Sequence, residues 1–150
     1  MIFRKATRED VANIVSMLAD DEIGALREEY SDPLPELYYK AYDKIAADPN
    51  QELIVVEDPA GDLIGTLQLS HIQYLTYKGG IRTQIEAVRI RKDRRGQGMG
   101  EKLFGWAIDR AREKGAHIVQ LTTDKKRAEA KKFYEKLGFS DSHEGMKLHL

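Results

Sequence analysis

The chain contains no cysteine, and this absence removes several kinds of chemistry at once. Without thiols there can be no disulfide, no thiolate zinc site and no cysteine nucleophile. Long apolar runs are also missing, because no stretch approaches the roughly 20 residues that span a bilayer. The first residues, Met1–Ala6, lack the apolar core of a signal peptide. We therefore expect a cytoplasmic protein with no membrane partner.

An excess of either charge is missing as well. Lys and Arg number 24 and Asp and Glu 25, which gives a net charge of −1. A dedicated nucleic-acid binder is normally clearly basic, so this balance argues against nucleic acid as a partner. A local basic stretch nevertheless remains at 89–95. The length of 150 residues, with 41% hydrophobic residues, suits one domain over 1–150 with one core.

The order of expected elements indicates the fold class. Apolar residues at helical spacing predict helices, which we place at 8–20, 36–47, 98–114 and 127–136. Strands are expected at 2–6, 53–56, 63–72, 83–90 and 117–121, with further candidates from Phe139 onward and at Met146–Leu150. Turn-forming residues predict a hairpin turn at 58–62 and a loop at 77–80. This order predicts an α+β, or α/β layered, fold around a mixed sheet flanked by helices.

The most informative stretch is Arg94–Gly100, in which glycines occupy every second position from Gly96. Glycine tolerates positive φ and lets another group approach the main chain closely. A helical pattern begins directly afterwards, so free backbone N–H groups and the positive end of the helix dipole converge there. Such a nest binds anions. Five basic residues surround the approach, namely Arg89, Arg91, Lys92, Arg94 and Arg95. The sequence therefore predicts a cradle for a diphosphate.

Two common nucleotide motifs do not fit this turn. A Rossmann fingerprint needs Gly-x-Gly-x-x-Gly after a first strand, whereas these glycines alternate and lie late in the chain. A P-loop needs Gly-Lys-Ser or Gly-Lys-Thr, which is absent. A surface turn without a ligand is the remaining alternative. It is disfavoured because each glycine loses extra entropy on folding.

Two motifs together resemble a known family. Arg95-Gly96-Gln97-Gly98-Met99-Gly100 resembles the Gln/Arg-x-x-Gly-x-Gly/Ala signature of the GCN5-related N-acetyltransferase (GNAT) superfamily. The segment Ala130–Phe139, which contains Phe-Tyr-Glu-Lys-Leu-Gly-Phe, resembles the family's second landmark. The resemblance covers most of the chain. It implies a GNAT-like acyl-CoA N-acyltransferase fold in a single domain.

The resemblance also implies a donor and the residues that hold it. The family moves an acetyl group from acetyl-coenzyme A (acetyl-CoA) to an amine, without a metal. The main chain of Arg95–Gly100 would hold the pyrophosphate, and Gln97, Met99, Glu101 and Lys102 would add backbone or helix-start contacts. Val88 and Ile90 would bind the pantetheine arm through their main chain, on a strand that splays from the next. The nearby basic side chains would meet the 3′-phosphate or form a solvated face. Homodimers are common in the family, so a homodimer is a further expectation.

Acyl transfer needs a neutral amine, a donor for the oxyanion and a proton for the departing thiolate. Tyr134 matches the family's tyrosine acid, with a core aromatic as its alternative role. Glu86 is the candidate base. Strand alternation places it on the side of Val88 and Ile90, where apolar neighbours would raise its pKa. A structural or substrate-binding carboxylate is the alternative for Glu86. His71 and His117 are weaker candidates.

The acceptor is less constrained than the donor. Arg127 stands where the family often has Asn, so it would bind coenzyme or shape the acceptor pocket. Residues 21–42 are rich in carboxylates and tyrosines, which favours a cationic amine or describes a solvated face. We expect a small-molecule amine, such as a polyamine or an aminoglycoside-like compound, with a protein N-terminus or lysine as the alternative acceptor. A non-catalytic acyl-CoA-binding regulator is the rival function, and a transcription factor is disfavoured because 89–95 offers no recognition helix.

Overall fold

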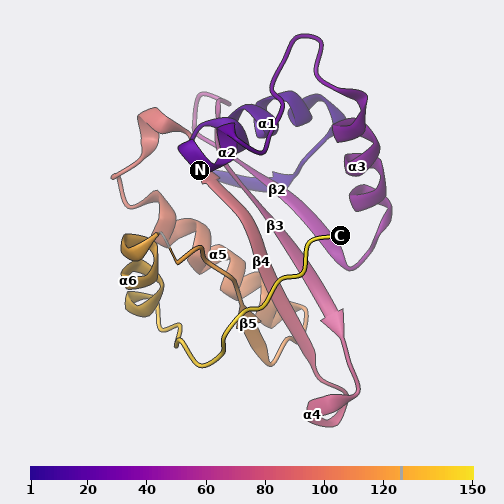
Figure 1. Cartoon of the computed structure of the whole chain (residues 1–150), viewed down its shortest axis with the longest axis vertical. Helices are drawn as coiled ribbons and strands as arrows, with labels where there is room; N and C mark the ends of the chain where they lie inside the picture. Colours follow the sequence, from indigo (N-terminus) through magenta and orange to yellow (C-terminus); the bar gives the residue numbers. More distant parts are fainter. Residues whose placement is uncertain (126) are drawn as a thin grey trace.

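The computed structural model describes residues 1–125 and 127–150 (Figure 1). In this part of the chain one sheet holds the strands in the order β1-β2-β3-β4-β5. Their bounds are Ile2–Lys5 for β1, Gln51–Glu57 for β2, Leu63–Gln73 for β3, Ile81–Ile90 for β4 and Ile118–Gln120 for β5. The strands β1 to β4 are antiparallel, and β5 runs parallel to β4. The mixed sheet predicted from the sequence is therefore confirmed.

The helices follow the predicted segments closely. They are α1 (Val11–Ala19, after a 3-10 turn at Arg8–Asp10), α2 (Glu22–Ala25), α3 (Glu36–Ala47), α4 (Thr76–Gly79), α5 (Met99–Glu113) and α6 (Ala128–Lys136). A capping box stands before α1, where the Thr7 N–H donates to the Asp10 carboxylate at 2.7 Å. The short helix α2 was not predicted.

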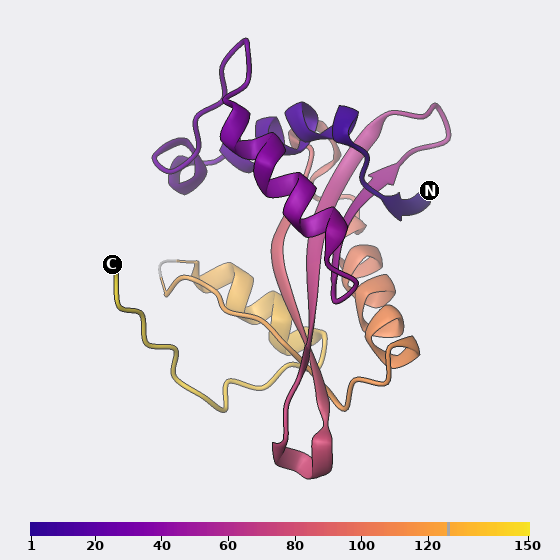
Figure 2. The ribbon, with the colours of Figure 1, turned by 90° about the vertical axis from the view of Figure 1, so that its right-hand side faces the viewer.

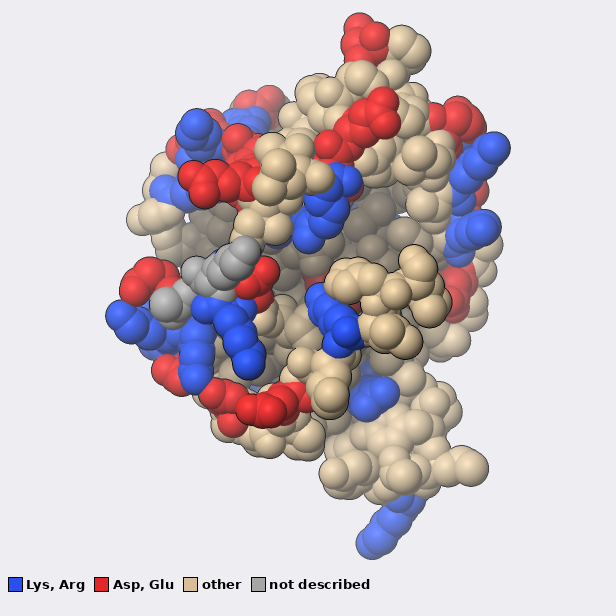
Figure 3. Space-filling model, in the orientation of Figure 1, with Lys and Arg blue, Asp and Glu red and all other residues tan. Residues whose placement is uncertain are grey.

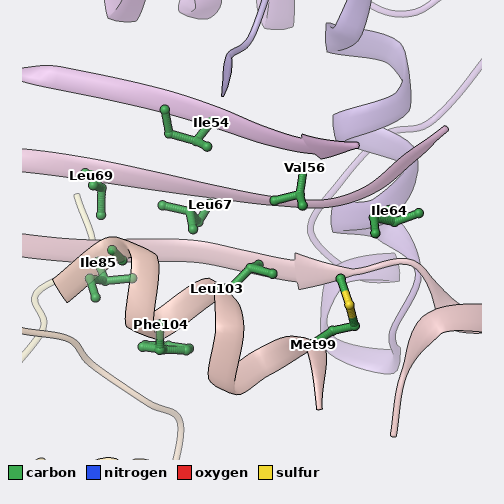
Figure 4. Close-up of a cluster of buried hydrophobic side chains, with 10 residues drawn as sticks. Ile54, Val56, Ile64, Leu67, Leu69, Ile85, Met99, Leu103 and Phe104 are labelled. Atoms are coloured by element: carbon green, nitrogen blue, oxygen red, sulfur yellow. The ribbon is translucent and has the colours of Figure 1, made fainter. Parts of the chain in front are cut away.

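Two clusters of apolar side chains bury the two faces of the sheet. On one face, Met99, Leu103 and Phe104 of α5 pack against strand residues such as Leu67 and Ile85 (Figure 4). On the other face, Ala6, Ile14 and Val55 form a second cluster, against which Leu18 and Tyr42 pack. Figure 2 shows α3 and α5 on opposite sides of the strands. The helices thus sandwich the sheet, and α5 starts at the end of β4.

Two predictions about local structure were wrong. The candidate strands after Phe139 do not form, and residues 137–150 carry no strand in the described chain. Apolar residues alternate there, yet a strand also needs a hydrogen-bonded neighbour, and Met146, Leu148 and Leu150 are all exposed. The loop expected at 77–80 is instead a single helical turn with left-handed backbone at Tyr77 and Lys78, which closes the β3–β4 hairpin.

A bulge in β4 shifts which side chains face α5. Gln68 pairs with Glu86 and Thr66 with Arg89, so one residue more lies on β4 than on β3 between these pairs. Ala87 absorbs the insertion with a φ of +53°. Bulges of this kind re-aim side chains and occur beside active sites. Strand alternation therefore changes phase at Ala87.

Substitutions at Ala87 test the bulge, because this residue has left-handed backbone. Ala87→Val should lower the free energy of unfolding by about 2 kcal/mol, because a β-branched residue is strained at positive φ. Ala87→Gly is the matched variant and should keep or raise stability, because glycine adopts this conformation freely. Urea unfolding of both variants measures the difference. Equal stability of the valine and glycine variants would show that Ala87 does not hold this backbone in solution.

Candidate active site

The candidate site begins where β4 and β5 separate. The two strands pair only from Arg82–Ile118 to Gln84–Gln120. A hydrogen bond of 2.7 Å from Gln120 to Gln84 marks the last paired position. Beyond it β4 continues to Ile90, while β5 ends at Gln120. The β4 main chain from 85 to 90 therefore borders a split in the sheet, as the family resemblance implied.

The glycine-rich turn closes one end of this split. Gly96 and Gly98 have φ values of +74° and +71°, and a Cβ on either would meet no protein atom within 4 Å. Gly98 is the N-cap of α5 and has no side chain to cap the helix. The first N–H groups of α5 have no partner inside the helix, so they are available to an anion. An open, left-handed turn at a helix start is what a diphosphate requires.

Gly100 has a different role in the same turn. A Cβ there would lie 3.0 Å from the Phe133 ring of α6. The missing side chain lets α6 approach the first turn of α5. At that contact Glu101 and Lys136 form an ion pair of 2.7 Å between the two helices. The two motifs that carry the family resemblance are therefore in direct contact.

The side chains around the turn are largely committed to neighbours. Arg95 donates to the Ile90 carbonyl at 3.0 Å and to Asp20 at 2.9 Å. Gln97 donates to the Asp93 carbonyl at 3.0 Å. Other basic side chains also meet carboxylates, Arg91 at Asp93 and Arg94 at Asp58. Met99 is buried, and Lys102 is exposed. The main chain, rather than these side chains, is the part free to bind a ligand.

Tyr134 reaches the site from α6. Its half-buried ring packs against Phe104, with centroids 5.4 Å apart, and against Phe139 at 6.1 Å. Burial raises the pKa of the phenol, and the charges of Arg127 and Arg89 offset part of that rise. The proton therefore stays on Tyr134 at neutral pH. Tyr134 can be both a core aromatic and an acid, because its ring packs against neighbouring aromatics while the charges of both arginines act on its hydroxyl.

The structure changes the surroundings expected for Glu86. We expected it on the side of Val88 and Ile90, but those two pack against the cluster that contains Ile85. The bulge at Ala87 causes this, because it adds a residue between Glu86 and Val88. Glu86 is exposed rather than set among apolar neighbours. Its role as a base stays a prediction, now on the sheet face opposite α5.

Three charged residues that are far apart in sequence meet beside the split. Arg127 donates to Asp21 at 2.9 Å, and Arg89 approaches the same carboxylate oxygen at 3.6 Å. Asp21 also caps α2 by accepting the Gly24 N–H at 2.5 Å. Sequence reasoning placed Arg89 in the basic stretch and Asp21 in the acceptor region. Nothing in the local pattern could pair positions 21 and 127.

The surface is hollowed at this place. In Figure 3 a recess lies between the α1–α2 region above and α6 at the lower left, with acidic and basic atoms on its border. A separate cavity of about 300 Å³ is lined by residues of α1, including Asn13 and Ser16, together with Asp20, Leu63 and Lys92. That cavity adjoins the β4 end of the site and does not contain Tyr134.

The two weaker candidates lie elsewhere. His71 is buried, with Nδ1 2.9 Å from the Thr83 hydroxyl and Nε2 3.5 Å from Glu52. His117 is exposed and contacts the Tyr74 hydroxyl at 2.7 Å. Among residues 1–125 and 127–150, no group of three or more His, Asp or Glu side chains is placed to hold a metal ion. No helix in the described chain is long and apolar enough to cross a membrane.

Comparisons with known proteins agree with this geometry. The model of the acetyltransferase (GNAT) family matches residues 16–139. An aminoalkylphosphonate N-acetyltransferase of Salmonella typhimurium is 30% identical over 144 residues, which is 93% of this chain and 85% of that protein.

Solved structures show the same fold. A protein described as a transcriptional regulator from Bacillus halodurans C-125 has a TM-score of 0.95 and 49% identity, with 99% of each chain covered. A predicted acetyltransferase from Clostridium acetobutylicum, solved with acetyl-CoA, has a TM-score of 0.74 at 22% identity, over 99% of this chain and 95% of that one. The family uses acetyl-CoA as its donor. The chain belongs to the acetyltransferase (GNAT) family and is an acyltransferase.

Proposed function

We propose that this enzyme transfers the acetyl group of acetyl-CoA to the primary amine of a small molecule by direct attack, with Tyr134 as the acid. The observation that carries the proposal is the contact between α6, the helix of Tyr134, and the open glycine turn that follows the unpaired end of β4. The Salmonella relative, an aminoalkylphosphonate N-acetyltransferase, supports a small amine as acceptor. We further propose that 1–150 is one catalytic domain, cytoplasmic and homodimeric.

The donor site follows from the backbone. In this proposal, N–H groups between Arg95 and Lys102 bind the pyrophosphate, and the free edge of β4 at Val88 and Ile90 binds the pantetheine arm. The left-handed glycines and the unpaired edge fit such a ligand without rearrangement. The bound donor supplies a thioester whose carbon the amine can attack.

In this proposal Glu86 and Tyr134 each carry out one proton transfer. Glu86 takes one proton from the ammonium form of the acceptor, directly or through water, so that the nitrogen has a free lone pair, and then releases that proton to solvent. A carbon–nitrogen bond forms as the carbon–sulfur bond breaks. The attacking nitrogen loses its second proton to water, and Tyr134 gives its proton to the departing sulfur. The phenol recovers a proton from solvent before the next turnover. The Tyr134 phenol holds the proton that it gives, because burial raises its pKa.

Gly98 tests the donor site. Gly98→Val should weaken acetyl-CoA binding about 10-fold or more, because its side chain would fill the open space over the turn and strain a left-handed residue. Isothermal titration calorimetry with acetyl-CoA measures the affinity. Gly115→Val is the matched control: Gly115 has φ +73° and an equally open Cβ position, at the other end of α5. The helix puts it about 22 Å away. Equal affinity of Gly98→Val and wild type would refute this placement.

A second candidate function has a specific observation behind it. The Bacillus halodurans structure, at 49% identity, is described as a transcriptional regulator. A non-catalytic regulator would keep the donor cradle and lose the transfer chemistry. Thiol release from acetyl-CoA with a panel of amines separates the two functions. Binding of acetyl-CoA without thiol release, together with specific binding of duplex DNA at physiological salt, would favour the regulator.

A further inference from the structure

Two arginines beside the split share a single carboxylate. Asp21 accepts from Arg127 at 2.9 Å, whereas Arg89 stays at 3.6 Å, beyond a good hydrogen bond. The Arg89 side chain is 12% exposed, so most of its guanidinium has lost water. Its Nη1 donates to the Val88 carbonyl at 2.9 Å, but its buried Nε has no partner among the described residues. Arg89 is thus a buried cation with spare donors.

Several neighbouring charged side chains, in the part of the chain that the structure describes, have ion-pair partners of their own. Arg27 and Glu28 bind each other at 2.9 Å. Glu28 also accepts from the Tyr38 hydroxyl at 3.1 Å. Asp20 forms an ion pair with Arg95 at 2.9 Å. Among the described residues, the ion pairs at this place therefore leave two arginines, Arg89 and Arg127, on the single carboxylate of Asp21. A buried charge is costly unless it is paired, so this excess favours an anion from outside.

The position of the pair ties it to the reacting centre. Arg89 follows the bulge, which turns it away from α5 and toward α2, where Asp21 lies. Arg127 immediately precedes α6, the helix that carries Tyr134. Both cations act on the Tyr134 phenol. An anion held here lies beside the acid group.

We infer that the acceptor carries, besides its amine, an anionic group such as a phosphonate or carboxylate that binds Arg89 and Arg127 in place of Asp21. The inference rests on the proposed function and narrows its substrate class. Guanidinium groups bind both anions in a forked geometry. Asp21 occupies the site when the acceptor is absent and bridges the two arginines. Within the acidic segment 21–42, Asp21, Glu28 and Glu36 pair with arginines, so a polycation is disfavoured.

Acceptors matched in length measure the preference. Thiol release is followed with 2-aminoethylphosphonate, β-alanine and propylamine. The wild type should show a kcat/KM at least about 10-fold higher for the two anionic amines than for propylamine, because hydrogen bonds to charged groups are strong. Arg127→Gln should reduce that ratio roughly 10- to 100-fold, mainly through KM.

Two further variants sharpen the test. Asp21→Asn keeps the oxygen that caps α2 but removes the competing charge, so it should lower KM for the anionic amines about 5-fold. Arg112→Gln is the control for loss of one arginine from an ion pair, since Arg112 binds Asp109 at 2.6 Å on the exposed face of α5. It should leave the acceptor ratio unchanged. A KM for the anionic amines that rises in Arg127→Gln and falls in Asp21→Asn cannot arise from general destabilisation.

Binding of ethylphosphonate, which has no amine, separates this inference from the proposed function. Calorimetry in the presence of coenzyme A should detect binding to wild type and a loss with Arg127→Gln. Binding without any transfer would support the anion site and reject the proposed reaction. Transfer to all amines without preference would overturn the anion site and leave the reaction intact. A fall in acetyl-CoA affinity with Arg127→Gln, at an unchanged acceptor ratio, would assign Arg127 to the coenzyme and overturn the inference. Absence of both transfer and binding would reject both.

Discussion

Tyr134→Phe should lower the kcat for thiol release from acetyl-CoA by about 100-fold or more, the usual range for a general acid. The departing thiolate then leaves without a proton from the protein. The substitution keeps the ring contacts with Phe104 and Phe139, so the fold should persist. Burial raises the pKa of Tyr134 above its ordinary value, so the wild-type phenol holds its proton at neutral pH. Stopped assays at saturating acetyl-CoA measure the loss in kcat.

Tyr42→Phe is the matched control for this variant. The Tyr42 hydroxyl donates to the Ala6 carbonyl at 3.0 Å on the face of the sheet opposite α5. Its loss should cost about 1 kcal/mol of stability and leave kcat unchanged. A Tyr134→Phe enzyme with wild-type kcat would remove Tyr134 as the required acid and leave it as a core aromatic.

Glu52→Gln should lower the free energy of unfolding by about 2 to 3 kcal/mol and the Tm by roughly 6 to 10 °C. Glu52 is 1% exposed and accepts from Arg110 at 2.6 and 2.8 Å, with Lys114 at 3.5 Å. Removal of its charge leaves these cations facing a neutral amide. The expected loss is below that of a fully buried pair because Arg110 is 31% exposed and keeps some water.

Glu113→Gln is the control, because Glu113 binds the same Arg110 at 2.8 Å but is 64% exposed. It should cost no more than about 1 kcal/mol. The effect of Glu52 should also depend on pH. The hydrogen bonds from Arg110 lower the pKa of Glu52 to about 2, below the ordinary value near 4.3. The stabilisation is therefore complete above about pH 4.3 and fades as pH falls toward 2. A constant difference between Glu52→Gln and wild type over that range would contradict this account.

The parts of the fold that were predictable from sequence depend on local pattern. The helix at 36–47 has the predicted bounds, and the Asp58–Asp62 turn forms as its residues indicate. The open turn at Gly96 and Gly98 before α5 was predictable because glycine spacing and a following helix are both local. The strands expected at the C-terminus fail for the opposite reason. Alternation at Met146–Leu150 is local, but pairing with a neighbour is not.

The acceptor side of the site could not be predicted in the same way. The residue inserted at Ala87 reverses which face of the sheet the following β4 side chains occupy. Nothing in the sequence Glu86-Ala87-Val88 indicates a bulge. The contact of Asp21 with Arg127 joins positions 106 apart and needs the folded chain. Both features decide which charges face the split. Sequence alone therefore left a cationic acceptor and a solvated acidic face as alternatives, whereas in the structure two arginines share the Asp21 carboxylate.

The most direct test of the central claim is a transfer assay with acetyl-CoA and amines, read by thiol release and by the mass of the product. The account predicts one free thiol for each acetylated amine, with wild type far faster than Tyr134→Phe. Tight binding of acetyl-CoA with neither thiol nor acetylated product, for anionic and neutral amines alike, would contradict it.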